Sequence, residues 1–321
     1  MNHWFRNMLT VRGAVLPLAA ALTLCLAPCT ALATEGGNTN KALGVDTVLT
    51  GVMPPPGMRL TTYVGYYTAD ETLDGQGDPR PNLSNFHVNA TAVTARFQYV
   101  YPNAKLFGAD IETRVGLTFF ADVDVRFDVQ TPGGQIHRSG AANGAFPGGL
   151  FAPLLLGWHG ETVHQITGLE LFFPAREYRP TKLANISSGY WSAAPAYWIT
   201  WFPIAPVEVS GSFVYLYNFE NGTTNYKSGQ EFNVDWGLGY DVTPTWQAGL
   251  NGYYYQQTTD DQLNGNDVAG GNRGRAAAVG PFIRFHPSRD FGIALKWQKE
   301  FAVENRASGN RFFLQFSAQL W

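Results

Sequence analysis

Few residues in this chain have the spacing that enzyme chemistry requires. The sequence lacks the G-x-S-x-G, G-x-x-x-x-G-K-[ST] and H-E-x-x-H patterns of nucleophile elbows, phosphate loops and zinc enzymes. Its mature-region histidines are scattered, except that His159 and His164 flank a predicted turn beside Glu161. A metal site there and an ordinary surface pair are both open interpretations, and we expect the surface pair. We therefore expect no catalytic residues, no metal and no cofactor.

An oxygen-rich stretch is the second candidate for metal chemistry. Carboxylate and amide oxygens are the ligands that calcium prefers. The stretch does not have the spacing of a known calcium loop, so we expect a solvated external loop. Its oxygen-bearing residues are Asp260, Asp261, Asn264, Asn266 and Asp267.

The strongest functional candidates are charged and aromatic residues on the polar faces of predicted strands. Aromatic faces could hold an apolar solute while polar groups orient it. The competing interpretation is that opposite charges only lock each other inside a filled barrel. The candidate residues of a solute path are Asp110, Glu112, Arg114, Glu170, Trp198, Glu231, Asp235, Tyr253, Tyr255, Phe282, Arg284, Lys296 and Glu300.

The element that positions these side chains is clearest in the stretch 107–128, FGADIETRVGLTFFADVDVRFD. Every second residue from Phe107 to Phe127 is apolar except Thr113, and the intervening positions carry most of the charges. Side chains alternate across a β-strand, so the apolar and charged sets occupy opposite faces. The stretch is longer than the ~9–11 residues that cross a bilayer. We expect a strand that rises above the membrane or breaks near Phe120.

The same alternation predicts an all-β fold, an antiparallel transmembrane β-barrel of about twelve strands. A soluble β-sandwich is the alternative architecture, but its connections need not alternate in length as these do. Long external loops and short periplasmic turns are typical of outer-membrane barrels, and the pattern predicts that both termini are periplasmic. The predicted strands are 58–69, 85–101, 106–120, 149–158, 162–173, 190–202, 206–218, 230–242, 245–258, 274–286, 290–304 and 311–321. The predicted long loops are 70–84, 121–148, 174–189, 219–229, 259–273 and 305–310, and the predicted turns are 102–105, 159–161, 203–205, 243–244 and 287–289.

Residues 1–33 predict a secretory signal peptide. Arg6 and Arg12 precede an apolar stretch, and a small-x-small cleavage site ends at Ala33. Both cysteines lie within this segment, so the mature chain would contain no disulfide. Removing two arginines makes the net charge more negative than the −3 of the full sequence, which argues against nucleic acid as a partner.

The remaining chain divides into an irregular N-terminal segment, 34–57, and a β-barrel, 58–321. The segment contains three consecutive prolines, and we expect it either to sit in the barrel mouth as a plug or to trail. Aromatic residues make up 14% of the sequence, and tryptophans fall near predicted strand ends, as in interfacial girdles. The final strand ends in an aromatic residue, which is typical of chains handled by the barrel-insertion machinery. The predicted location is the outer membrane of a Gram-negative cell, in contact with its lipids.

Ordered sequence blocks resemble the outer-membrane transporter-like proteins linked to the meta-cleavage pathway of phenol degradation. The blocks are 51–57 followed by Tyr63, Tyr67 and Asp74, then 148–158, 185–195, 218–229, 252–260 and Gly280-Pro281. The family's Pro-Thr-Gly-x-Tyr pattern is replaced here by PAREY at 174–178. The resemblance implies an outer-membrane barrel that passes small hydrophobic or aromatic compounds, with no established catalytic residues.

Three functions remain open from the sequence. The favoured one is a channel for passive uptake of small hydrophobic or aromatic solutes. The second is an outer-membrane enzyme acting on lipid, which would require a serine–histidine pair near the membrane edge. The third is a plugged barrel with a structural role.

Overall fold

The structure is a computed structural model that describes residue 35 and residues 39–176 and 178–321. The predicted signal peptide, 1–33, lies outside the described residues. No helix within the described ranges is long and apolar enough to cross a bilayer.

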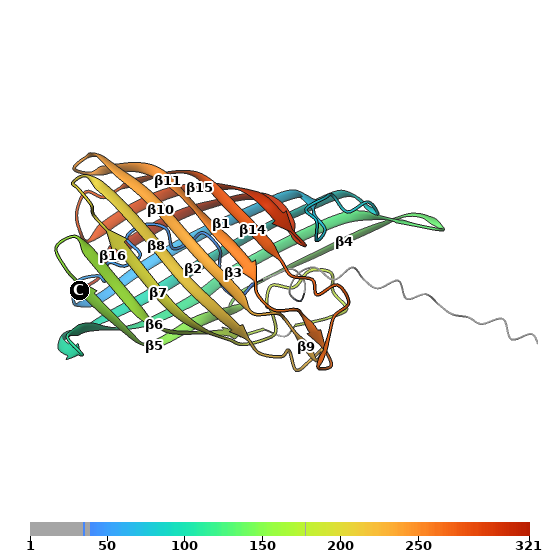
Figure 1. The fold of residues 1–321 in the computed structure, drawn as a ribbon, viewed down its shortest axis with the longest axis horizontal. Helices are drawn as coiled ribbons and strands as arrows, with labels where there is room; N and C mark the ends of the chain where they lie inside the picture. Colours follow the sequence, from blue (N-terminus) through green and yellow to red (C-terminus); the bar gives the residue numbers. More distant parts are fainter. Residues whose placement is uncertain (1–34, 36–38, 177) are drawn as a thin grey trace, which may run out of the picture. The chain divides into compact units, whose positions relative to one another are not determined.

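Twelve antiparallel strands form one closed sheet (Figure 1). Each barrel strand pairs with the next barrel strand along the chain, including β2 with β3. The first strand, β1, also pairs with the last, β16, so the sheet closes on itself. The strands are β1 (Gly57–Thr72), β2 (Leu83–Leu106), β3 (Ala109–Thr131), β5 (Gly148–His159), β6 (Val163–Pro174), β7 (Ser192–Trp201), β8 (Val207–Asn218), β10 (Glu231–Thr243), β11 (Trp246–Gln257), β14 (Arg275–Phe285), β15 (Phe291–Glu304) and β16 (Ala307–Gln319). The predicted all-β barrel is confirmed, and the sandwich is excluded because its sheets would have free edges.

Three predicted connections are wrong. The predicted loop 121–148 instead contains the outer part of β3 and the strand β4 (Gly134–Gly144), which form a hairpin extending past the other strand ends (Figure 1). The predicted turn 102–105 lies within β2, and the chain reverses at Phe107 and Gly108, both with positive φ. The predicted loop 305–310 is a tight turn, because only Asn305 and Arg306 separate β15 from β16.

The external connections also form a small sheet that the sequence did not predict. It consists of β9 (Tyr226–Lys227), β12 (Gln262–Leu263) and β13 (Asn266–Asp267). These short strands join the connection between β8 and β10 to the connection between β11 and β14. Two loops that are distant in sequence therefore support each other at the same end of the barrel.

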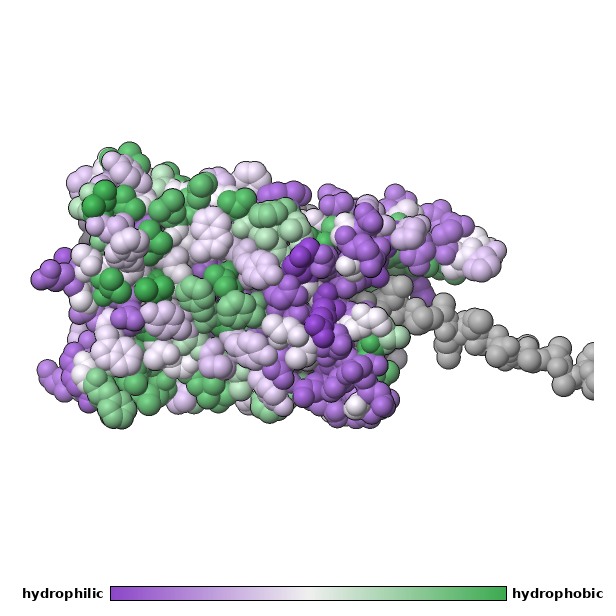
Figure 2. Space-filling view, viewed as in Figure 1, coloured by the Kyte–Doolittle hydropathy of each residue, from purple (hydrophilic) through white to green (hydrophobic). Residues whose placement is uncertain are grey.

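The outer face is apolar and the inner face is polar. On β15, Leu295 is 55% exposed, whereas the adjacent Lys296 is 3% exposed. On the face shown in Figure 2, apolar side chains cover the strands, and hydrophilic side chains gather at the end that carries the β3–β4 hairpin. An unpaired ionised group facing lipid would be costly, so the charges point inward at membrane depth.

The alternation of inward and outward side chains along β3 is interrupted at Phe119 and Phe120. The strict alternation read from residues 107–127 is therefore wrong at this point. The pairing of β2 with β3 shifts here, and both phenylalanine side chains are exposed. Thr118 and Ala121, on either side of them, both line an interior cavity. A β-bulge places two consecutive residues on one face. Asp122 and Asp124 therefore lie on the outer face of the extension, and the strand rises above the membrane without ending.

Residues 39–56 contain no strand or helix and run through the inside of the barrel. Thr39 contacts Glu231 at the outer end of β10, and Leu49 N donates to Glu208 near the opposite end of β8. Pro55 O accepts a hydrogen bond from Gln319 beside the C-terminus. Both ends of the barrel lie at the periplasmic end, as predicted, since Met58 N donates to Trp321 O at 3.1 Å. Glu35 instead contacts Ser228 in an external connection, so the segment before the barrel enters from the opposite end.

Candidate functional site in the barrel interior

Most of the predicted solute-path residues are buried inside the barrel. Glu112, Arg114, Glu170, Trp198, Glu231, Asp235, Tyr253, Tyr255, Phe282, Lys296 and Glu300 each expose 5% or less of their surface. The structure divides them into separate groups along the barrel wall. Their grouping depends on contacts with residues 39–56 and with β1, β2 and β16.

The first group surrounds Arg114 on β3. Arg114 Nε donates to Glu112 Oε1 at 2.8 Å, and Arg114 Nη1 donates to Glu170 Oε1 at 3.2 Å. The guanidinium lies 4.9 Å from the ring centre of Trp198, and Gln98 Nε2 donates to Glu112 Oε1 at 3.1 Å. Two carboxylates and an aromatic face therefore hold one arginine, which is the locking arrangement considered from the sequence.

The second group joins the barrel wall to the N-terminal side of the chain. Lys41 Nζ lies 2.6 Å from Asp235 Oδ2, and Gly44 N donates to Asp235 Oδ1 at 2.9 Å. Asp46 N also reaches Asp235 Oδ2, at 3.2 Å. On the opposite side, Arg96 Nη1 donates to Asp46 Oδ1 at 2.8 Å. Because the two wall residues are on β10 and β2, the segment is held from opposite sides.

The third group is centred on Glu300. Glu300 Oε1 accepts from Tyr253 Oη, and Glu300 Oε2 accepts from Tyr67 Oη at 2.9 Å and from Gly309 N at 2.7 Å. Arg311 lies over both tyrosine rings, 4.5 Å from the centre of Tyr67 and 5.5 Å from that of Tyr253. A similar contact lies nearby, where the guanidinium carbon of Arg306 is 4.4 Å from the ring centre of Tyr255.

Five predicted path residues lie outside these groups. Glu231 accepts from Thr39 and Asn218, Lys296 Nζ donates to Val45 O at 2.9 Å, and Phe282 is buried.

The other two path residues lie nearer the barrel mouth. Asp110 is at the periplasmic start of β3, where its carboxylate pairs with Lys105 at 2.6 Å and remains partly exposed. Arg284 is near the end of β14, 4.0 Å from Glu208. Both are therefore at the mouth of the barrel.

The sequence analysis missed several interior residues that make the same kinds of contact. Arg96, Arg311, Tyr63 and Tyr67 lie on inner faces of strands, and the same alternation could have identified them. Lys41 and Asp46 belong to a segment without periodicity. No local signal indicates which strands such a segment contacts.

A cavity lies between residues 39–46 and the wall formed by β1, β2, β3, β5 and β6. Its volume is about 310 Å³. One side is apolar, with Leu150, Phe172 and Phe173, and the other carries the charged side chains Lys41 and Asp46. Residues 185–188 of the external connection between β6 and β7 also line it, so the cavity occupies the outer half of the interior.

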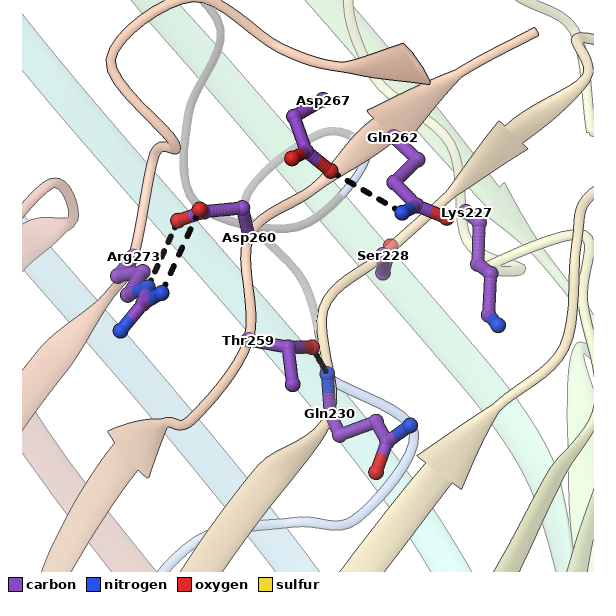
Figure 3. Close-up of a pocket in the computed structure, with 8 residues that line it drawn as sticks. All are labelled: Lys227, Ser228, Gln230, Thr259, Asp260, Gln262, Asp267 and Arg273. Carbon is purple, nitrogen blue, oxygen red and sulfur yellow. Dashed lines mark hydrogen bonds and ion pairs between the residues drawn. The ribbon is translucent and has the colours of Figure 1, made fainter. Parts of the chain in front are cut away.

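A second cavity of about 300 Å³ lies among the external connections (Figure 3). All of its lining residues are polar: Lys227, Ser228, Gln230, Thr259, Asp260, Gln262, Asp267 and Arg273. Asp260 accepts from Arg273 Nε at 2.7 Å, which raises the pKa of the guanidinium, and Asp267 accepts from Gln262. The cavity is therefore bordered by neighbouring opposite charges.

The predicted oxygen-rich stretch is divided between two roles. Asp261 is buried and accepts from Gly229 N at 2.7 Å and from Gln257 Nε2 at 2.8 Å, whereas Asp260 and Asp267 face the second cavity. Burial, followed by the hydrogen bond to Asp261, raises the pKa of Tyr226. Within the described residues, no three His, Cys, Asp or Glu side chains converge as metal ligands.

The histidine contacts bear on the lipid-enzyme alternative. His87 contacts Asp70 and Asn89, His137 contacts Asp128, and His159 contacts His164. These hydrogen bonds, all within the described part of the chain, bring no serine to a histidine.

Comparisons with known proteins are consistent with this architecture. The structure is similar to the COG4313 outer membrane channel from Pseudomonas putida F1, at 13% identity and a TM-score of 0.65, over 87% of this chain and 99% of that one. That similarity supports the fold. The NanC porin gives a TM-score of 0.40 at 10% identity over 81% and 100% of the two chains. The CymD monoaromatic hydrocarbon channel gives 0.42 at 9% over 84% and 89%. No curated protein sequence matches the chain.

The closed barrel, apolar outside and polar inside, is that of a Gram-negative outer-membrane protein. Residues 69–316 match the model of the Phenol_MetA_deg family, described as "Putative MetA-pathway of phenol degradation". Since that match covers most of the sequence, this chain belongs to the Phenol_MetA_deg family.

Proposed function

We propose that this barrel is a passive outer-membrane channel for small hydrophobic or aromatic compounds. The observation that carries the proposal is the outer cavity of about 310 Å³. A cavity of ~150 Å³ lined by apolar side chains is large enough to hold benzene. The outer cavity therefore has room for a substituted aromatic ring, and the family's description concerns phenol degradation.

The walls of the cavity suit a solute with one apolar and one polar part. Phe172 and Phe173 offer ring faces, whereas Arg96 and Glu170 offer charged hydrogen-bonding groups. Arg96 is paired with Asp46 and Glu170 with Arg114, so their charges are locally compensated. A neutral solute with a hydroxyl group would meet hydrogen-bonding partners without a strong net field.

Passage beyond the cavity requires residues 39–56 to move. The segment occupies the interior from Thr39, beside Glu231, to Pro55, beside Gln319. It has no strand pairing of its own, and side chains and single backbone groups hold it to the wall. We infer that a partial shift of this segment opens the path, with Glu112, Glu231, Lys296 and the other inward groups lining it.

The proposal is tested by uptake of a radiolabelled monoaromatic compound into cells that lack the native gene. Cells are compared with no protein, native protein, Ala121→Trp and Val115→Trp. Ala121 lines the cavity, so Ala121→Trp should reduce uptake several-fold. Val115 is on the outer face of the same strand, so Val115→Trp is the matched control and should keep native uptake. Equal uptake with and without the native protein would overturn the proposal.

A plugged barrel with a structural role is the second candidate. It is favoured by the buried contacts of Lys41 with Asp235 and of Gly51 N with Thr200. In that case no variant would change uptake, but removal of the protein would weaken the outer membrane toward detergents. The uptake measurement therefore separates the two functions.

A further inference from the structure

The two adjacent histidines at the periplasmic end of the barrel form the arrangement of a metal chelate. His159 is the last residue of β5, His164 is near the start of β6, and the two are directly opposite in the strand register. His159 Nδ1 lies 3.1 Å from His164 Nδ1. Only residues 160–162 separate the strands, and Gly160 N donates to Val163 O at 2.8 Å, so the hairpin fixes this spacing.

Both rings are on the inner side of the wall, at the mouth. Gly157 is on the same face of β5 as His159, and Ile166 is on the same face of β6 as His164. Both Gly157 and Ile166 are buried in the interior. The ring of His164 packs edge-on against Phe202, with ring centres 5.7 Å apart. His159 remains exposed to the periplasmic solvent. The pair is therefore held in place and open to an ion from one side.

The separation of the two nitrogens suits one transition-metal ion. Zinc–nitrogen bonds are ~2.0–2.1 Å, and two such bonds spanning 3.1 Å meet at an angle of about 100°. That angle lies between the values for tetrahedral and square-planar coordination. Without a metal, the same distance is a hydrogen bond in which one imidazole donates and the other accepts.

The thioether of Met53 lies beside the other edge of the His159 ring. A Cβ placed on Gly157 would lie 2.6 Å from Met53 Cε, 3.2 Å from Met53 Sδ and 3.0 Å from His159 Nε2. The thioether is therefore on the Nε2 side of His159, away from the Nδ1 that faces His164, and does not complete the chelate. Thioether sulfur favours Cu(I), whereas imidazole accepts Zn²⁺, Cu²⁺ and Ni²⁺.

We propose that His159 and His164 form a binding site for a divalent transition-metal ion at the periplasmic mouth. Water completes the coordination. Among divalent ions the site binds Cu²⁺ most tightly, following the general order of affinities for nitrogen ligands. The site does not depend on the proposed channel function.

The test is calorimetric titration of the purified, detergent-solubilised protein with CuCl₂ and ZnCl₂, using a purification tag without histidine. The native protein should bind one Cu²⁺, and an electron paramagnetic resonance spectrum should show coupling to imidazole nitrogens. His159→Ala and His164→Ala should each weaken binding at least 10-fold. His137→Ala is the matched control, because His137 is exposed beside a carboxylate but has no histidine partner, and it should keep native affinity.

Thermal unfolding of each metal-free variant checks that the barrel is intact. Zn²⁺ should compete with Cu²⁺ in the native protein and not in the double variant His159→Ala/His164→Ala. Met53→Leu should leave both Cu²⁺ and Zn²⁺ affinity unchanged, because the thioether lies on the Nε2 side of His159, away from the two Nδ1 atoms. Equal Cu²⁺ affinity in the native protein and the double variant would overturn the proposal, since binding would then come from another group such as the terminal amine.

Discussion

Lys41 Nζ and Asp235 Oδ2 lie 2.6 Å apart with both side chains buried, and this ion pair joins the N-terminal segment to strand β10. The same carboxylate accepts hydrogen bonds from Gly44 N and Asp46 N. One wall residue thus holds three positions of a segment that has no strand pairing of its own.

Replacing Asp235 with Asn should loosen this segment. Lys41 would keep its charge without a partner, and breaking a buried ion pair costs about 3–5 kcal/mol. We expect a lower unfolding temperature and a several-fold higher single-channel conductance in planar bilayers. Asp124→Asn, on the exposed extension of β3, should behave as native protein. Unchanged conductance and stability in Asp235→Asn would show that the ion pair does not hold the segment.

Gly237 tests how closely the segment approaches the wall. A Cβ at Gly237 would lie 1.9 Å from Thr47 O, which is backbone, so Gly237→Ala must displace residue 47. Overpacking of this kind costs about 1–3 kcal/mol. Gly239→Ala is the control on the same strand face, since the three atoms nearest its Cβ would belong to the side chain of Gln247, at 2.8–3.1 Å. In denaturant unfolding, the midpoint of Gly237→Ala should be well below that of Gly239→Ala. Equal midpoints would contradict the close approach of Thr47 O to Gly237.

The apolar outer surface predicts that a charged side chain lowers the folding stability by an amount that depends on its depth in the membrane. Leu295 is 55% exposed on the apolar face of β15, so Leu295→Arg should destabilise the barrel by about 2–4 kcal/mol. Val242→Arg, near the periplasmic end of β10, should cost about 0–1 kcal/mol. Equilibrium folding into lipid vesicles measures both. Equal costs at the two positions would argue against Val242 lying nearer the membrane surface than Leu295.

The β3–β4 hairpin should open at low pH. Asn85 Nδ2 donates to Asp128 Oδ2 at 2.7 Å, and His137 Nδ1 lies 2.7 Å from Asp128 Oδ1. These hydrogen bonds, that of Asn85 foremost, hold the pKa of Asp128 below its ordinary value. Because the folded-state pKa is the lower one, the stabilisation is complete above about pH 4, the pKa of an unfolded Asp, and is lost as pH falls through the folded value.

Hydrogen exchange of residues 121–144 as a function of pH measures this opening. Protection, after correction for the intrinsic exchange rate, should fall only below about pH 4. Asp128→Asn should remove the pH dependence. A pH dependence that persists in Asp128→Asn would show that another group controls the opening.

The barrel and its two faces were predictable because each depends on local alternation. On β15, Leu295 and Lys296 differ in exposure as their order in the sequence requires. The predicted strand ends were wrong where the alternating pattern continues beyond the membrane-spanning part of a strand. The length of β3 indicated an irregularity near Phe120, but the alternation did not show that it would be a bulge, because an extra apolar residue leaves an apolar stretch apolar.

The candidate site was predictable only in part. Glu112, Arg114 and Asp235 are buried as expected, because a charge on a membrane strand has only the interior available. Which charge pairs with which could not be read from the sequence, because partners such as Lys41 and Asp235 are far apart in the chain.

By itself, the sequence determined a closed sheet with an apolar exterior, since period-two alternation and repeated turns are encoded residue by residue. The tertiary structure alone decided the course of residues 39–56, the cavity beside them and the packing of Met53 against Gly157. These depend on where a segment without periodicity comes to rest. That position is set by the summed contacts of many strands rather than by any pattern in the segment.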